Sequence, residues 1–165
     1  MIGMTMQQAL NAQINQEQYS AQLYLAMSGH LQGLAFRGFA HWLRIQSSEE
    51  TAHATRLVGF LLDRGGALKL EPVAAPPAAF GGVIPSFEQV LAHERVLTGL
   101  IGGLFELARK EKDHASEIAL QWYVAEQVKE EAGVSQIVDQ LHAVGDKGGG
   151  IWYLDSKLGK RGAAS

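Results

Sequence analysis

The sequence contains no cysteine, only four prolines and no long apolar run, and each of these scarcities excludes a class of protein. Without cysteine, the chain cannot form disulfides, thiolate zinc sites, iron–sulfur clusters or a cysteine nucleophile. No apolar stretch is long enough to cross a bilayer, so no membrane partner is expected. The opening residues, Met1–Thr5, lack the charged start and apolar stretch of a secretory signal. These features together predict a cytoplasmic protein.

The chain also has little excess charge of either sign. It carries 14 Lys and Arg against 17 Asp and Glu, a formal net charge of -3, which gives no electrostatic reason to expect nucleic acid as a partner. A small basic cluster, Lys157, Lys160 and Arg161, is interpreted as a solvated tail. A length of 165 residues with 47% hydrophobic content suits one globular domain with a sizeable core.

Apolar residues recur at alternating steps of three and four along most of the chain, the spacing typical of packed helices. The stretches with this pattern run from about Thr5 to Gln32, Phe36 to Arg64, Ser86 to Lys112 and His114 to Val144. No strand-like alternation competes with this pattern. We predict an all-α four-helix bundle over about 5–144 and a short C-terminal helix over about 151–158, together forming a single domain over 1–165.

The four prolines lie between the second and third helical stretches, in Gly65 to Pro85. At about 3.3 Å per extended residue, this segment can run the length of a helix of about 28 residues. We therefore predict a long crossover that leaves the second and third helices parallel. The short connections elsewhere predict antiparallel pairs of helices one and two, and of helices three and four. Ser86 is predicted to cap the start of the third helix.

Polar side chains interrupt each apolar seam near its middle. They are Glu17 in the first helix, Glu50 and His53 in the second, Glu94 in the third, and Gln127 and Glu130 in the fourth. Ionised carboxylates out of water are costly unless they are paired or bound to a metal. The four seams contain no lysine or arginine that could neutralise these carboxylates, and two metal cations would balance four carboxylates better than one.

The positions of these residues along the helices are consistent with one shared site. Antiparallel pairing brings Glu17 level with about residue 51, and Glu94 level with about residue 130. Glu50 and His53 are three residues apart, so both lie on one helix face and can hold the same ion. A lone buried Glu or His is more often structural, but four interruptions at matching heights favour a metal centre. An oxygen-rich ligand set with one imidazole suits iron or manganese.

These motifs resemble those of the bacterial non-haem ferritins over nearly the whole chain. The matching segments are Asn15–Tyr24, Glu49–His53, Leu120–Gln127 with Glu130 and Glu131, and Gly150–Asp155 with Leu158. The resemblance implies that the all-α bundle is a single ferritin-like domain. It implies iron storage and detoxification in a cage of 24 identical subunits. It also implies ferroxidase activity, in which Fe²⁺ is oxidised by O₂ or peroxide and deposited inside the cage as ferric oxyhydroxide.

The resemblance also assigns roles to residues. Glu17, Glu50 and His53 would hold one iron, with Glu50 bridging to the second. Glu94 and Glu130 would hold that second iron, with Gln127 close by. Tyr24 would be the catalytic tyrosine beside the di-iron centre. Because the fourth helix offers Gln127 and Glu130 in place of a second Glu-x-x-His motif, the two iron positions are expected to be unequal.

Two departures from related families refine these expectations. Bacterioferritins carry a haem-binding methionine between the Glu and His of the second helix, where this chain has Thr51 and Ala52, so no haem is expected. Bacterial ferritins often add a third iron site, for which Glu49, Glu126 and Glu130 are candidates. Lys129 occupies a position that is frequently acidic in that site.

Two other functions are compatible with a carboxylate bundle. A di-iron oxidoreductase acting on an organic substrate or peroxide would use similar ligands without a cage. A non-catalytic assembly or metal-buffering protein would bind metal without oxidising it. The size of the particle and a turnover assay separate these alternatives.

Overall fold

The computed structural model describes residues 1–162, which form five helices and no strand. The helices are α1 (Met4–Gly33), α2 (Arg37–Asp63), α3 (Val83–Lys110), α4 (His114–Val144) and α5 (Gly149–Leu158). The predicted all-α four-helix bundle with a short fifth helix is therefore confirmed. Within the described part of the chain, no helix is both long enough and apolar enough to span a membrane.

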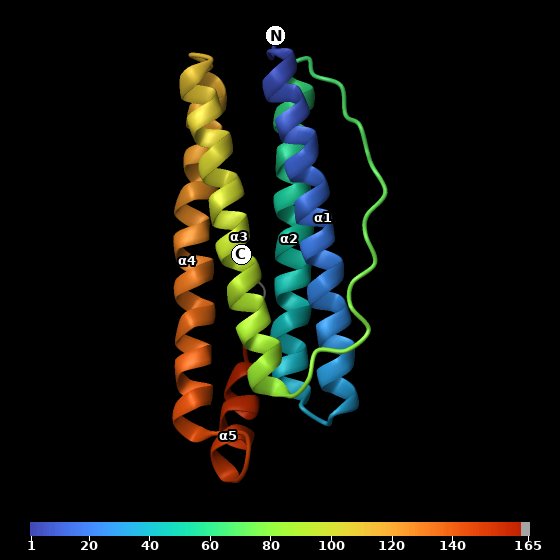
Figure 1. Ribbon diagram of the computed structural model, residues 1–165, viewed down its shortest axis with the longest axis vertical. Coiled ribbons are helices and arrows are strands. Elements are labelled where there is room, and N and C mark those ends of the chain that lie inside the picture. The colour runs from blue at the N-terminus through green and yellow to red at the C-terminus, as the bar shows by residue number, and fades with distance from the viewer. Residues whose placement is uncertain (163–165) are drawn as a thin grey trace.

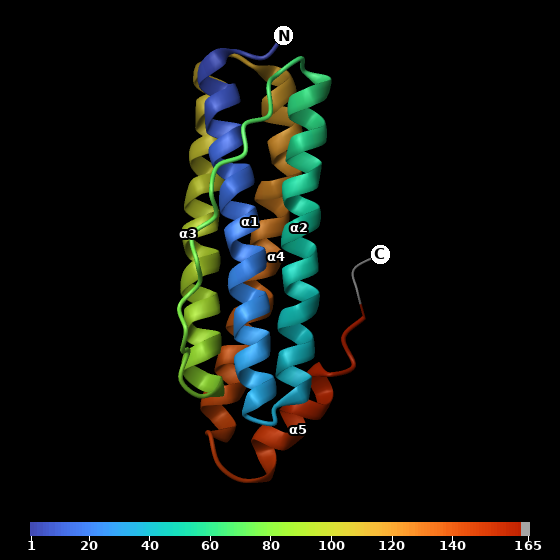
Figure 2. The ribbon, with the colours of Figure 1, turned by 90° about the vertical axis from the view of Figure 1, so that its right-hand side faces the viewer.

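The four long helices lie side by side, with α5 across one end of the bundle (Figure 1). Short turns join α1 to α2 and α3 to α4, so each of these pairs is antiparallel. The segment between α2 and α3 returns along the outside of the bundle, which leaves those two helices parallel, as predicted (Figure 2).

Polar side chains of α1 hold the crossover against the bundle. Asn11 donates from Nδ2 to the Ala67 carbonyl at 3.0 Å and accepts at Oδ1 from the Lys69 N–H at 2.7 Å. Asn15 donates to the Glu71 carbonyl at 3.1 Å. Backbone polar groups that lack secondary structure need such partners, so these contacts define the path of an otherwise irregular segment.

The third helix starts earlier than predicted. α3 begins at Val83, with Gly82 at the N-cap, and the predicted cap Ser86 lies inside the first turn. Proline is tolerated there because the first four N–H groups of a helix have no intrahelical acceptor, so Pro85 removes no hydrogen bond. Ser86 instead donates from both its N–H and its Oγ to the Gly82 carbonyl, at 3.1 and 2.8 Å.

The fifth helix docks at the start of α2. The Asp155 carboxylate accepts a hydrogen bond from the Phe39 N–H at 2.9 Å, which satisfies a backbone donor that the first turn of α2 leaves free. The close approach requires a glycine, because a Cβ on Gly38 would lie 1.6 Å from the Asp155 carbonyl oxygen. Asp155 thus caps the N-terminus of α2 although it lies 116 residues from Phe39 in the sequence.

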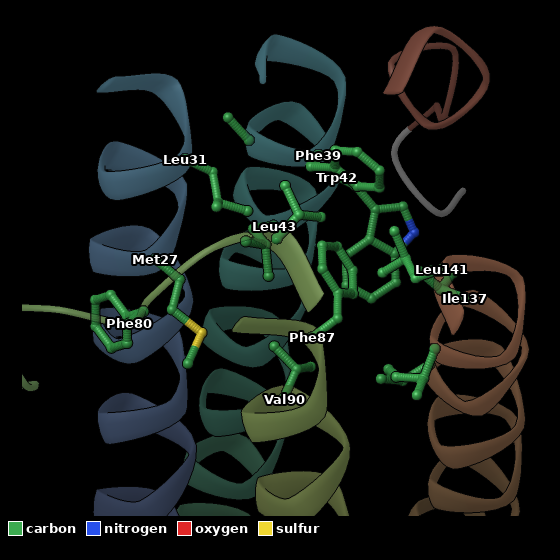
Figure 3. Packing of buried hydrophobic residues seen from close by; sticks show 14 of the residues in the cluster. Met27, Leu31, Phe39, Trp42, Leu43, Phe80, Phe87, Val90, Ile137 and Leu141 are labelled. Atoms are coloured by element: carbon green, nitrogen blue, oxygen red, sulfur yellow. The ribbon is translucent and has the colours of Figure 1, made fainter. Parts of the chain in front are cut away.

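Two hydrophobic clusters fill the bundle, one toward each end. The cluster nearer α5 includes Met27, Leu43 and Phe87 (Figure 3). The other includes Leu10, Leu57 and Ile101 from three different helices. The polar interruptions of the seams lie between these clusters in sequence on every long helix, so apolar layers enclose them above and below.

Candidate metal centre

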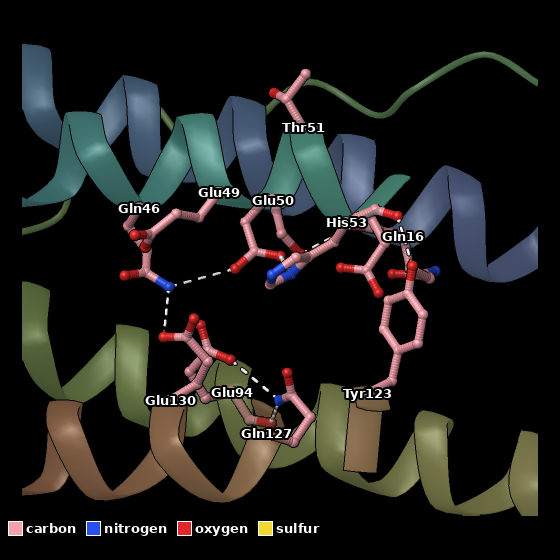
Figure 4. A network of polar contacts seen from close by, with 12 residues as sticks. Gln16, Gln46, Glu49, Glu50, Thr51, His53, Glu94, Tyr123, Gln127 and Glu130 are labelled. Atoms are coloured by element: carbon pink, nitrogen blue, oxygen red, sulfur yellow. Dashed lines mark hydrogen bonds and ion pairs between the residues drawn. The ribbon is translucent and has the colours of Figure 1, made fainter. Parts of the chain in front are cut away.

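The polar residues of the seams meet in the middle of the bundle (Figure 4). Glu17 from α1 and Glu50 and His53 from α2 each offer one ligand atom, and these atoms lie within 4.8 Å of one another. All three side chains are buried. The structure therefore brings the first three predicted ligands within reach of one metal ion.

The α3–α4 pair supplies the facing half of the site. Glu94 is fully buried, and its Oε2 accepts a hydrogen bond from Gln127 Nε2 at 3.2 Å. Glu130 Oε2 accepts from the Nε2 of Gln46 on α2 at 2.6 Å. The same amino group lies 3.4 Å from Glu50 Oε1. A buried amide thus links the carboxylates of the two halves.

Burial makes these carboxylates hard to ionise. It is the largest cause that raises the pKa of Glu17 and of Glu50 to about 8 and the pKa of Glu130 to about 7. The negative charges of neighbouring carboxylates raise these pKa values further. The pKa of Glu94 is also raised, again mainly by burial. Without a bound cation, these carboxylates therefore retain protons near neutral pH, and cation binding would displace those protons.

One carboxylate oxygen shows most directly that the site suits a cation. Glu50 Oε2 is buried, and when the neighbouring glutamates are ionised it accepts no hydrogen bond from any described residue. Its neighbour is His53 Nδ1, at 3.4 Å. An unsatisfied buried oxygen is costly unless something binds it, and a metal ion between Glu17, Glu50 and His53 would satisfy it. The donor set of carboxylates and one imidazole fits iron.

Hydrogen bonds from the surrounding side chains orient these groups. The fully buried Tyr24 donates from its hydroxyl to Glu94 Oε1 at 2.5 Å. Burial, followed by the charge of Glu94, holds the pKa of Tyr24 well above its usual value, so the phenol remains a neutral donor. On the α1–α2 side, Gln13 donates to Glu17 Oε1 at 2.8 Å. Such partners fix the orientation of the groups that bind a metal.

The candidates for a third iron site lie at the α2–α4 face. Two of them, Glu49 and Glu126, do not belong to the predicted di-iron centre, and each already forms an ion pair. Glu49 pairs with Arg161, Nη2 to Oε2 at 2.5 Å, and Glu126 pairs with Lys129 at 2.7 Å. A pocket of about 240 Å³ on this face is bordered by Glu49, Glu126, His53 and Glu130. The face therefore gives access to the centre, but two protein cations occupy the carboxylates expected to hold a third metal.

Interpreting Arg161 as part of a solvated tail was wrong. Its guanidinium donates from Nη1 to Gln46 Oε1 at 2.9 Å as well as to Glu49, and it lies 4.6 Å from the centre of the Trp42 ring. Local periodicity gives no signal for a contact across 115 residues. Gln46, by contrast, lies in the seam of the second helix and interrupts its apolar residues, so its spacing could have identified it.

Two further residues lie near the centre. Tyr123 packs edge-on against the His53 ring, and its hydroxyl donates to the His53 carbonyl at 2.9 Å. Thr51 points away from the centre (Figure 4), and its hydroxyl donates to the Ser47 carbonyl.

Comparison with known proteins places this arrangement in a family. A family model described as a ferritin-like domain matches residues 7–144. A bacterial non-haem ferritin from Bacteroides fragilis is 40% identical over 161 residues, which is 98% of this chain and all of that protein. One from Staphylococcus aureus is 31% identical, over 98% of this chain and 97% of that protein. The solved structure of an open-pore ferritin from the archaeon Archaeoglobus fulgidus superimposes with a TM-score of 0.97 at 42% identity, covering 98% of this chain and all of that one.

Proposed function

The chain belongs to the ferritin-like family, and from this premise we propose that it stores iron by oxidising Fe²⁺ at the buried carboxylate centre. The observation that carries the proposal is the set of four interior glutamates, one of which has a buried oxygen without a hydrogen-bond partner. Curated relatives of nearly equal length named non-haem ferritins support iron as the metal.

In this proposal the first Fe²⁺ is held by Glu17, Glu50 and His53, and Glu50 also reaches the second ion. Gln13 fixes the Glu17 carboxylate, while Tyr123 anchors the backbone of α2 at His53. Each Fe²⁺ gives up one electron to O₂ or peroxide. The residues contribute by holding two ions close together in a site enclosed by apolar layers, where charged ligands act strongly.

The second Fe²⁺ is held by Glu94 and Glu130, with Gln127 beside it. This position lacks an imidazole and has an amide in its place, so the two positions are expected to bind with unequal affinity. The Tyr24 hydroxyl donates to Glu94, and we propose that it holds the unbound oxygen of that carboxylate in place. Protons displaced from the glutamates leave as Fe²⁺ binds.

We also propose that 24 copies assemble into a hollow cage in the cytoplasm and that the ferric product is deposited inside it. Similarity over the full length to ferritins, one described as open-pore, supports such an assembly. The other two functions, a di-iron oxidoreductase without a cage and a metal buffer without turnover, predict a different particle size and a different oxidation behaviour, respectively.

The direct test compares Fe²⁺ oxidation in air by the wild-type protein and by Glu50→Ala. The variant removes the proposed bridging ligand, and we expect the initial rate to fall by at least 100-fold. A fall of this size corresponds to an activation free energy higher by ~3 kcal/mol. Glu106→Ala is the matched control, since Glu106 is an exposed glutamate of α3 and its loss should leave the rate unchanged. An unchanged rate in Glu50→Ala would overturn the proposed centre.

A further inference from the structure

The chain beyond α5 folds back alongside α2 and brings Arg161 to the edge of the metal centre (Figure 2). Its backbone carbonyl lies 2.9 Å from His41 Nε2, and its guanidinium lies over Trp42. The side chain is half-buried rather than solvated, with one nitrogen on Gln46 and another on Glu49. Arg161 is thus fixed by contacts to both its backbone and its side chain.

The contact with Gln46 determines which way a buried amide points. Gln46 is 0% exposed, and its amide has one end that accepts hydrogen bonds and one that donates them. Arginine can only donate, so the amide oxygen must face Arg161 Nη1, 2.9 Å away. The amino end then necessarily points inward, toward Glu130 Oε2 at 2.6 Å and Glu50 Oε1 at 3.4 Å (Figure 4).

The opposite orientation of the amide would be unfavourable at this position. It would direct the amide oxygen at two carboxylate oxygens and the amino group at a guanidinium, leaving buried groups without partners. In the observed orientation, the amino group holds one oxygen of Glu130 and leaves the other free to bind a metal. Glu50 and Glu130 come from opposite halves of the centre, so one amide affects ligands for both ions.

We propose that Arg161 is a positioning residue of the metal centre, acting through Gln46 on the orientation of Glu50 and Glu130. The proposal rests on the function proposed above, since it assumes that these two glutamates bind metal. It assigns a role to a residue outside the bundle. Hydrogen bonds to groups that bind metal, such as that from Gln46 to Glu130, typically contribute about 10–100-fold to affinity.

Lysine should not replace Arg161. The guanidinium donates in two directions from one plane while stacking on Trp42, whereas an ammonium is a point charge on a flexible stem. A lysine would retain the attraction to Glu49 without fixing the Gln46 amide. Arg161→Lys therefore separates an effect of orientation from an effect of charge alone.

The test is anaerobic titration of the assembled apoprotein with Co²⁺, whose visible absorption reports the ligands around each ion without any oxidation step. We expect wild type to bind two Co²⁺ per chain. Arg161→Ala should weaken binding by about 10–100-fold at one or both positions and alter the Co²⁺ spectrum, and Arg161→Lys should not restore either property. Lys160→Ala, which removes a neighbouring exposed cation of the same segment, should bind Co²⁺ as wild type does.

A double-mutant cycle shows whether the effect passes through Gln46. Arg161→Ala should cause little further loss in a Gln46→Ala background and its full loss in a Glu49→Ala background. Particle size and thermal unfolding, measured on every variant, confirm that the assembly is intact. The Arg161 substitutions should leave the helices in place, because Arg161 follows the last residue of α5.

Three results would overturn the inference: unchanged Co²⁺ affinity and spectrum in Arg161→Ala, full restoration by Arg161→Lys, or an effect that persists without Gln46 and disappears without Glu49. The proposed function would fail in a different way: the wild-type protein itself would not bind two Co²⁺ per chain.

Discussion

The interior glutamates hold more protons in the folded apoprotein than in the unfolded chain, because burial raises their pKa. For Glu17 and Glu50 the pKa rises from 4.5 to about 8. The folded state therefore binds more protons than the unfolded state between these values, and stability falls as pH rises. A bound divalent cation opposes this dependence, since it replaces the protons and stabilises the ionised glutamates.

We predict that the thermal midpoint of the apoprotein decreases between pH 6 and pH 8, and that saturating Co²⁺ under anaerobic conditions removes most of this decrease. Co²⁺ affinity should increase over the same range, with release of protons measurable by calorimetry in buffers of different ionisation enthalpy. Glu17→Gln, which cannot ionise, should flatten the pH dependence of the apoprotein. A stability that increases with pH would contradict the assigned protonation.

At the scale of helices, the seam pattern predicted most of the architecture because each long helix buries one continuous stripe. The polar interruptions were predicted for the same reason, since Glu17, Glu94 and their partners occupy stripe positions. Contacts between distant segments could not be predicted in this way. Asp155 caps the start of α2, and Arg161 contacts Gln46. The sequence around each of them looks like an ordinary short helix or polar tail and gives no sign of these contacts.

The start of α3 is a second feature that the sequence pattern did not predict correctly. Pro85 suggested that the helix begins after it, although a proline in the first turn loses no hydrogen bond. The register of α2 against α3 was also unpredictable from sequence, because a long crossover leaves their offset free. The structure resolves it through the hydrogen bond from Gln46 on α2 to Glu130 on α4 and that from Tyr24 on α1 to Glu94 on α3.

The docking of α5 on α2 can be tested by substituting Gly38. Gly38→Ala places a methyl group against the Asp155 carbonyl and should destabilise the protein by about 1–3 kcal/mol, as overpacking does. Gly59→Ala is the matched control on the same helix, because a Cβ there meets no atom within 4 Å; it should stabilise the helix by about 0.5–1 kcal/mol. Thermal unfolding of both variants measures the difference, and equal midpoints would contradict the docking.

For the whole molecule, the proposed cage explains why a chain of this size leaves several large apolar side chains exposed. Ile118, Val128, Trp152 and Tyr153 are more than half exposed on the single chain, and assembly can cover such surfaces. We predict a stable particle of about two dozen chains, which light scattering measures directly. Glu50→Ala should form the same particle, because its substitution lies inside the bundle. A stable monomer or dimer would favour the oxidoreductase without a cage.

We propose that each chain oxidises iron at a centre for two ions, and the number of ions oxidised per chain tests this directly. The most direct measurement follows the amplitude of rapid oxidation as Fe²⁺ is added to apoprotein in air in increasing ratios to the chain. We expect a break at two Fe²⁺ per chain, followed by slower oxidation, and the loss of this rapid phase in Glu50→Ala. A break at one Fe²⁺, or a rapid phase that persists without Glu50, would contradict it.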